Sequence, residues 1–146
     1  MPRPSFDPRW PITKLRGRPL ITVLLVDDSN FQRVANRRLL ERAGYKVISV
    51  SDGHEALQVA TDESPDVILL DMLLQKMAGP DVLKALKINP KTATIPVIVL
   101  SSLAQRNEAK LMRDGAAGYY EKSRMNVDNG SGLLELIHTL LRESLA

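Results

Sequence analysis

The chain has 146 residues, contains no cysteine and carries a formal net charge of +3. This length suits one domain that buries a core without disulfides, and the lack of cysteine excludes a disulfide framework, a thiolate zinc site and a cysteine nucleophile. No apolar stretch approaches the roughly 20 residues of a membrane span or resembles the centre of a secretory signal, so we expect a soluble, cytoplasmic protein.

Residues 1–19 form a basic, proline-rich N-terminal extension. They hold five of the nine prolines and five basic residues against Asp7 alone, a local charge of +4 that leaves −1 for residues 20–146. Proline disfavours continuous helix or sheet, so we expect this segment to be extended and flexible, with Phe6 and Trp10 available to contact a partner or the domain. The domain itself therefore lacks the overall basic charge of a nucleic-acid-binding domain.

From residue 20 onward, apolar strands alternate with amphipathic helices. The pattern predicts strands at 21–26, 46–50, 67–70, 96–100 and 118–121. Five strands of this kind, several of them apolar on both faces, favour a parallel sheet covered by helices on both sides. We therefore predict a doubly wound, flavodoxin-like α/β domain over residues 20–146, with strand order 2-1-3-4-5 and five flanking helices.

The five helices are predicted from apolar spacing and from residues that begin or end helices. The first ends at Gly44, the second begins at Asp52-Gly53, the third follows Gly79-Pro80, the fourth spans Leu103 to Asp114, and the last follows a glycine-rich loop at 128–132. The first helix is inferred from apolar residues at helical spacing: Phe31, Val34, Ala35, Leu39 and Ala43. In the third, the residues expected to face inward are Val82, Leu83 and Leu86.

Polar residues follow the ends of four predicted strands: Asp27 and Asp28, Asp71, Ser101, and Lys122. The carboxyl ends of parallel strands share one edge of a sheet, and ligands of open α/β sheets bind there. Three carboxylates packed together repel unless a cation neutralises them, and Mg²⁺ prefers carboxylate and water oxygens. The sequence therefore predicts a magnesium site at this edge.

An aspartate beside magnesium can act as a nucleophile toward phosphorus and form an acyl phosphate. Lys122 and Ser101 would supply a positive charge and a hydroxyl to the transferred group. Taken singly, these residues also suit plainer roles, as a helix cap, a loop hydroxyl and a solvated lysine. His54 and His138 fall on predicted helices and are expected to be solvated rather than metal ligands.

The sequence resembles the receiver domain of bacterial two-component response regulators over about residues 20–146. The segments that carry the resemblance are LLVDDS, SDGHEAL, DVILLDMLLQKMAGPDVL, IPVIVLSS and GAAGYYEK. The resemblance implies that Asp71 accepts a phosphoryl group from a histidine kinase or a histidine phosphotransfer protein. It also implies that Mg²⁺ is held by Asp27, Asp28, Asp71 and the backbone carbonyl of Leu73.

Three further roles follow from the resemblance. Ser101 would be the switch hydroxyl, Lys122 would pair with the phosphate, and Tyr119 would be the aromatic residue whose orientation changes with the active state.

The resemblance also implies a surface for a downstream protein, which is not identified. This protein would bind through helix 4, strand 5 and helix 5 of a monomer or a phosphorylation-dependent dimer, and no contact with nucleic acid or membrane is expected. Tyr120 is expected to pack in the core, because adjacent strand residues face opposite ways.

The chain departs from the family pattern at two positions. Gln75 stands where the family usually has proline, four residues after the phosphoacceptor, and Ser123 stands in place of the proline after the lysine. A receiver-like docking module that works without phosphate is therefore an alternative. An aspartyl phosphohydrolase, which needs a second aspartate at the position of Leu73, is a weaker one, and a flavodoxin-like cofactor site is disfavoured because Asp27 and Asp28 would repel phosphate.

The first predicted helix carries four arginines, at positions 33, 37, 38 and 42. In the family this neighbourhood meets the phosphodonor, so the arginines either recognise an acidic surface of the donor or form an ordinary solvated face.

Overall fold

The computed structural model describes residues 20–102 and 108–145, and the N-terminal extension predicted at 1–19 lies outside them. The described residues contain one sheet of five parallel strands in the order β2-β1-β3-β4-β5. Its strands are β1 (Thr22–Val26), β2 (Lys46–Val50), β3 (Val67–Asp71), β4 (Val97–Ser101) and β5 (Gly118–Glu121). The predicted fold class and strand order are therefore confirmed.

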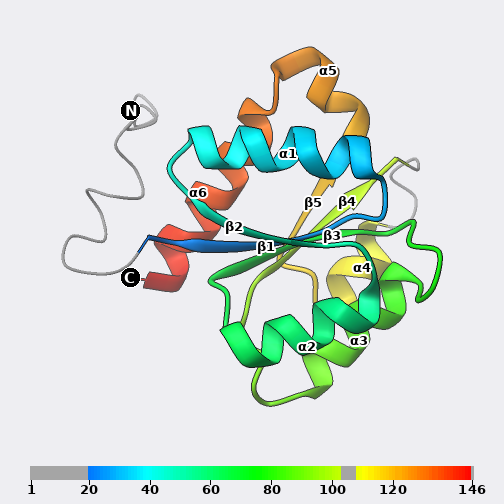
Figure 1. Ribbon diagram of the computed structural model, residues 1–146. Helices are drawn as coiled ribbons and strands as arrows, with labels where there is room; N and C mark the ends of the chain where they lie inside the picture. The colour runs from blue at the N-terminus through cyan, green and yellow to red at the C-terminus, as the bar shows by residue number, and fades with distance from the viewer. Residues whose placement is uncertain (1–19, 103–107, 146) are drawn as a thin grey trace.

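Helices cover both faces of the sheet (Figure 1). They are α1 (Asn30–Arg42), α2 (Gly53–Glu63), α3 (Gly79–Ile88), α4 (Glu108–Arg113), α5 (Met125–Asp128) and α6 (Ser131–Leu145), together with a 3-10 turn, η2 (Lys122–Arg124). Helices α1 and α6 pack on one face, and α2, α3 and α4 pack on the other. No helix of this described part is long and apolar enough to cross a membrane.

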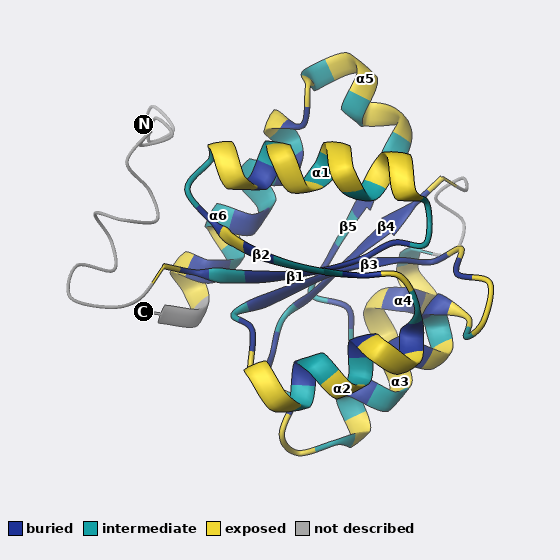
Figure 2. Cartoon of the chain, viewed as in Figure 1, coloured by how far each residue is buried: buried dark blue, intermediate teal, exposed yellow. Residues whose placement is uncertain are grey.

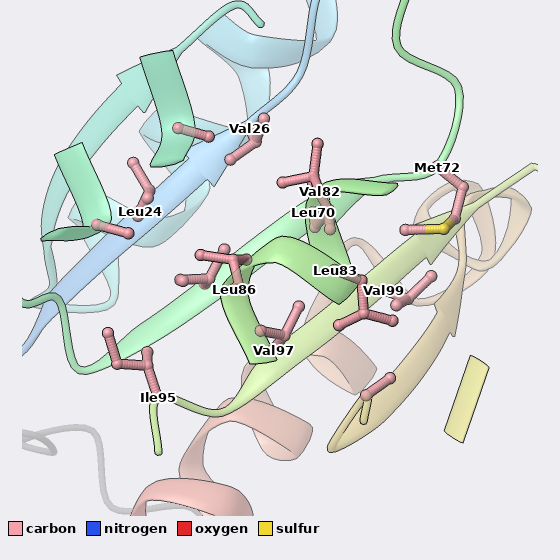
Figure 3. Packing of buried hydrophobic residues seen from close by; sticks show 14 of the residues in the cluster. Leu24, Val26, Leu70, Met72, Val82, Leu83, Leu86, Ile95, Val97 and Val99 are labelled. Carbon is pink, nitrogen blue, oxygen red and sulfur yellow. The ribbon is translucent and has the colours of Figure 1, made fainter. Parts of the chain in front are cut away.

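The two faces of the sheet bury separate apolar clusters because successive strand residues point to opposite sides. In β1, Leu24 and Val26 point toward α2 and α3, whereas Val23 and Leu25 point toward α1 and α6. Figure 3 shows the first cluster, in which the α3 side chains lie over the central strands. Every residue of β3 and β4 is buried, which is expected of central strands covered on both faces.

Helix α1 is confirmed, and two of the apolar residues used to predict it, Leu39 and Ala43, are half-buried, but the others do not form its buried face. Leu40 is the buried residue of this helix, while Phe31 is 83% exposed and Val34 is 42% exposed. Figure 2 shows the outer side of α1 as mostly exposed. Apolar residues at helical spacing predict that a helix forms. Which side of α1 faces the sheet depends on how the helix packs, and the spacing alone does not determine that.

The segment between β5 and the last helix also differs from the prediction. It contains η2 and the single turn α5, so the described residues hold six α-helices where five were predicted. The carboxylate of Asp128 accepts hydrogen bonds from the amides of Gly130 and Gly132 and from the Tyr120 hydroxyl, which fixes this turn. The fourth helix was predicted from Leu103; its described part begins at Glu108, and residues 103–107 lie outside the description.

Candidate functional site

Three aspartates meet at the carboxyl edge of the central strands. Asp27 and Asp28 directly follow β1, and Asp71 is the last residue of β3. One carboxylate oxygen from each lies within 4.8 Å of the others. Asp27 and Asp71 are buried, and Asp28 is half-buried. The structure thus brings together the three carboxylates that the sequence placed at this edge.

Both carboxylate oxygens of Asp71 have partners. Oδ1 accepts a hydrogen bond from the backbone amide of Leu73 at 3.0 Å, and Oδ2 accepts one from the Lys122 ammonium at 2.8 Å. Lys122 lies 51 residues further along the chain, directly after β5. The adjacent Ser123 therefore does not prevent the lysine from reaching the acidic cluster.

Lys122 has two further neighbours. Its Nζ lies 3.7 Å from Oδ2 of Asp27 and donates a hydrogen bond of 2.8 Å to Oε1 of Gln32, in the first turn of α1. The lysine side chain is 16% exposed, so its charge is partly removed from water. One ammonium therefore links two of the three carboxylates to helix α1.

The electrostatics of the cluster favour a cation. Burial raises the pKa of Asp27 above its ordinary value, although the Ser29 amide and Lys122 oppose the shift. Oδ2 of Asp27 is buried and has no hydrogen-bond partner among the described residues. Three carboxylates facing one ammonium leave two negative charges uncompensated. Oxygen ligands with this charge fit Mg²⁺, which binds carboxylates and keeps water in its remaining positions.

Asp28 is held from the loop after β3. Its Oδ2 accepts a hydrogen bond from the backbone amide of Gln75 at 3.0 Å. The two residues line a small pocket together with Ser51, Asp52 and Lys76. The half-buried Asp28 therefore lies on the side of the acidic cluster that is open to solvent.

The predicted switch residues lie on β4, which neighbours the strand of Asp71, and on β5, the next strand beyond it. Ser101, the last residue of β4, is buried and follows Leu100, which pairs with Asp71. Tyr119 of β5 is half-buried against the cluster under α2, α3 and α4. Tyr120 faces the opposite way and is 4% exposed, which confirms that it packs in the core.

The four arginines of α1 fall into two groups. Arg33 donates to the carbonyl of Asp27 at 2.9 Å, and Arg37 bonds Ser49 and pairs with Glu41. The other two, Arg38 and Arg42, are exposed, as Arg37 also is. The basic surface of α1 is therefore smaller than the count of arginines suggests.

A groove of about 380 Å³ runs between α1 and the segment after β5. Its apolar residues include Phe31, Ala35, Leu39 and Met125, and its polar residues include Gln32, Asn36 and Lys122. The groove reaches the acidic cluster at Lys122, which lines the groove and donates a hydrogen bond to Asp71. This groove was not predicted from the sequence.

Gln32 is the contact residue that sequence reasoning missed. A signal was present, because Ser29 and Gln32 have the spacing of a capping box, in which the glutamine side chain returns to the amide of the capping serine. In the structure that amide donates to Oδ1 of Asp27 at 2.9 Å instead. The glutamine side chain therefore turns to Lys122.

Comparison with known proteins places this geometry in context. Residues 23–129 match the family model of the response regulator receiver domain. The chain is 32% identical over 106 residues to the polar-differentiation response regulator DivK of Brucella anthropi, covering 73% of this chain and 86% of that protein. It is also 35% identical over 119 residues to the gliding motility regulatory protein of Myxococcus xanthus. This match covers 81% of this chain but only 15% of that protein.

Solved structures give the same likeness. The response regulator domain of Thermotoga maritima CheB matches with a TM-score of 0.75 and 29% identity, covering 85% of this chain and 98% of that one. The chemotaxis response regulator CheY4 of Vibrio cholerae matches with a TM-score of 0.67 and 30% identity, covering 71% and 88%.

Proposed function

Because the chain belongs to the response regulator receiver domain family, we propose that it accepts a phosphoryl group on Asp71 from a histidine kinase or a histidine phosphotransfer protein. The observation that carries this proposal is the Asp71–Lys122 pair beside Asp27 and Asp28. A carboxylate that could act as the nucleophile, a positive charge and two carboxylates that could hold a cation meet at this point, which supports the proposal.

In the proposed reaction, a carboxylate oxygen of Asp71 forms a bond to phosphorus while the bond from phosphorus to the donor's histidine nitrogen breaks. The nitrogen keeps the electron pair and takes a proton from solvent. Lys122 already touches the accepting carboxylate at 2.8 Å, so its ammonium is placed to pair with an oxygen of the arriving group. The Leu73 amide holds the other carboxylate oxygen and fixes the orientation of the nucleophile.

Asp27, Asp28 and Asp71 would hold Mg²⁺, with the backbone carbonyl of Leu73 as a further ligand. When bound, the ion supplies positive charge that offsets the negative oxygens of the transferred group. The buried Oδ2 of Asp27 supports this assignment, because it has no hydrogen-bond partner among the described residues and its one cationic neighbour, Lys122, lies 3.7 Å away and is hydrogen-bonded to Asp71.

The phosphoryl group would bring up to two negative charges and three acceptor oxygens to the sheet edge. Ser101 is the hydroxyl proposed to move toward these oxygens, and Tyr119 is the side chain proposed to reorient in response. The surface that would change is formed by α4, β5 and the last helix, α6. We propose that a downstream protein binds there and that the chain is a signalling receiver rather than a metabolic enzyme.

The donor is proposed to dock on α1 and the groove beside it. The exposed side of α1 offers Phe31 and Val34 together with Arg38 and Arg42. An apolar contact surrounded by positive charge suits a partner helix with acidic residues at its rim. The groove opens at Lys122, so a donor bound there would reach the phosphoacceptor.

The direct test is phosphorylation by phosphoramidate with Mg²⁺, followed by intact mass. We expect the wild type to gain one phosphoryl group when Mg²⁺ is present and none when it is chelated. The variant Asp71→Asn should gain none under either condition. Asp81→Asn, which changes an exposed aspartate at the start of α3, is the matched control and should behave as wild type. No gain by the wild type would contradict the proposal and favour the phosphate-independent docking module.

A further inference from the structure

Gln32 connects helix α1 to the reacting edge of the sheet. Its Oε1 accepts a hydrogen bond from Nζ of Lys122 at 2.8 Å, the same distance that separates Nζ from Oδ2 of Asp71. Lys122 and Gln32 are 90 residues apart in the sequence. The ammonium is thus held between the proposed phosphoacceptor and a neutral acceptor from another element.

The position of Lys122 explains why such an anchor matters. The residue begins the turn η2 just after Glu121, the last residue of β5, so the strand does not extend past it. A lysine side chain has a flexible four-carbon stem, and fixing it costs conformational entropy. A second acceptor reduces the number of positions the ammonium takes.

The anchor is available because the capping bonds of α1 are already satisfied. The Ser29 hydroxyl accepts from the Gln32 amide, and the Ser29 amide donates to Asp27. The glutamine side chain is therefore not needed at the helix end. An amide oxygen also differs from a carboxylate, because it orients the ammonium without adding a fourth negative charge to the cluster.

We infer that Gln32 is a positioning residue for phosphoryl transfer, acting through Lys122. When an oxygen of the transferred group takes over as the charged partner of the ammonium, the amide oxygen keeps its bond, so Lys122 stays directed at the reacting atoms. This inference rests on the proposed function. Gln32 is exposed, so its substitution is not expected to disturb the core.

The test is a double-mutant cycle on the rate of phosphorylation by phosphoramidate with Mg²⁺. Gln32→Met keeps the length of the side chain and removes the acceptor, and it should slow the reaction about fivefold, the value of one modest hydrogen bond. In a Lys122→Met background the same change should have no further effect. Gln58→Met, the same change at an exposed glutamine of α2 outside the groove, is the matched control and should leave the rate unchanged.

Gln32→Glu gives an independent check. A carboxylate there would draw the ammonium from Asp71 and repel the incoming phosphoryl group, so the reaction should be slower than with Gln32→Met. Equal losses from Gln32→Met with and without Lys122 would overturn the inference, because a structural role predicts independent effects. An unchanged rate in Gln32→Met would also overturn it.

The inference can fail while the proposed function holds, when the wild type gains a phosphoryl group and Gln32→Met reacts at the same rate. If the wild type gains no phosphoryl group, the proposed function is contradicted, and so is a role of Gln32 in transfer. Nuclear magnetic resonance of the lysine ammonium groups then decides whether the anchor exists. The Lys122 signal should shift in Gln32→Met and stay in place in Gln58→Met; a Lys122 signal that does not shift in Gln32→Met would show that the anchor is absent.

Discussion

The backbone amide of Gln75 donates a hydrogen bond to Oδ2 of Asp28 at 3.0 Å and ties the loop after β3 to the loop after β1. Proline, which the family usually has at this position, cannot make this bond. Without magnesium, Gln75→Pro should lower the free energy of unfolding by about 1 kcal/mol, measured by urea denaturation. With Mg²⁺ bound the loss should shrink, because the ion then holds Asp28.

Gln75→Ala keeps the amide and should leave the free energy of unfolding unchanged, so it is the matched control for Gln75→Pro. A loss that is equal with and without magnesium would contradict this explanation. It would point to backbone strain from proline rather than to the hydrogen bond to Asp28.

The Tyr120 hydroxyl should make the free energy of unfolding fall at high pH. Burial, followed by its hydrogen bond to Asp128 and the charge of that carboxylate, raises the pKa of Tyr120 to about 12. The fold favours the neutral phenol over the phenolate. The contribution of Tyr120 to the free energy of unfolding is therefore complete below about pH 10, the pKa of tyrosine in the unfolded chain, and is lost as the pH rises through about 12. Tyr120→Phe should therefore lower the urea midpoint at neutral pH and remove part of the alkaline loss.

Tyr119→Phe is the control for this measurement, because Tyr119 packs on the opposite face of the sheet from Tyr120, the residue that bonds Asp128. It should leave the alkaline loss of stability in place. If Tyr120→Phe loses stability between about pH 10 and about pH 12 as steeply as the wild type, the hydroxyl does not carry this effect.

Adding a side chain at Gly79 should create a steric clash beside Asp71, the proposed phosphoacceptor. A Cβ at this position would lie 2.5 Å from Cα of Met72 and 2.8 Å from the carbonyl oxygen of Asp71. Backbone atoms cannot rotate away, so Gly79→Ala should displace this segment and lower the free energy of unfolding by about 2 kcal/mol. Phosphorylation by phosphoramidate should slow as well. The control Ala78→Ser changes the exposed N-cap of α3 and should be neutral or slightly stabilising.

The site residues whose positions could be predicted from the sequence are those that the order of the parallel strands places at one edge of the sheet. Asp27, Asp28 and Asp71 each follow an apolar run, and once the strand order is 2-1-3-4-5 their carboxylates have to share one edge. Lys122 follows the outer strand β5, yet its long side chain reaches Asp71. The positions of these four residues therefore depend on the order of the strands and little on the details of packing.

The part that sequence could not predict depends on how helices meet the sheet. The apolar spacing of α1 predicted a helix, but Phe31 faces solvent and Leu40 faces the core, because packing selects the register. The Tyr120–Asp128 bond and the bond from Gln32 to Lys122 join side chains from different elements. Such pairs have no fixed spacing in the sequence, so only the assembled fold reveals them.

The docking prediction for α1 becomes more specific with the structure. Arg33 and Arg37 make hydrogen bonds within the domain, and reversing their charge would disturb the loop that carries Asp27 and the contact with β2. Arg38 and Arg42 are exposed. These two arginines are therefore the ones to substitute when recognition of a donor is tested.

The double variant Arg38→Glu/Arg42→Glu should slow phosphotransfer from a histidine phosphotransfer protein about tenfold or more at low salt, since reversed charges oppose association. Phosphorylation by phosphoramidate should be unchanged, because the small donor needs no docking surface. The difference from wild type should narrow as salt screens the charges. Lys84→Glu/Lys91→Glu, which reverses two exposed lysines on α3 and in the loop that follows it, is the matched control and should transfer normally. Equal slowing with both donors would contradict a docking role for α1.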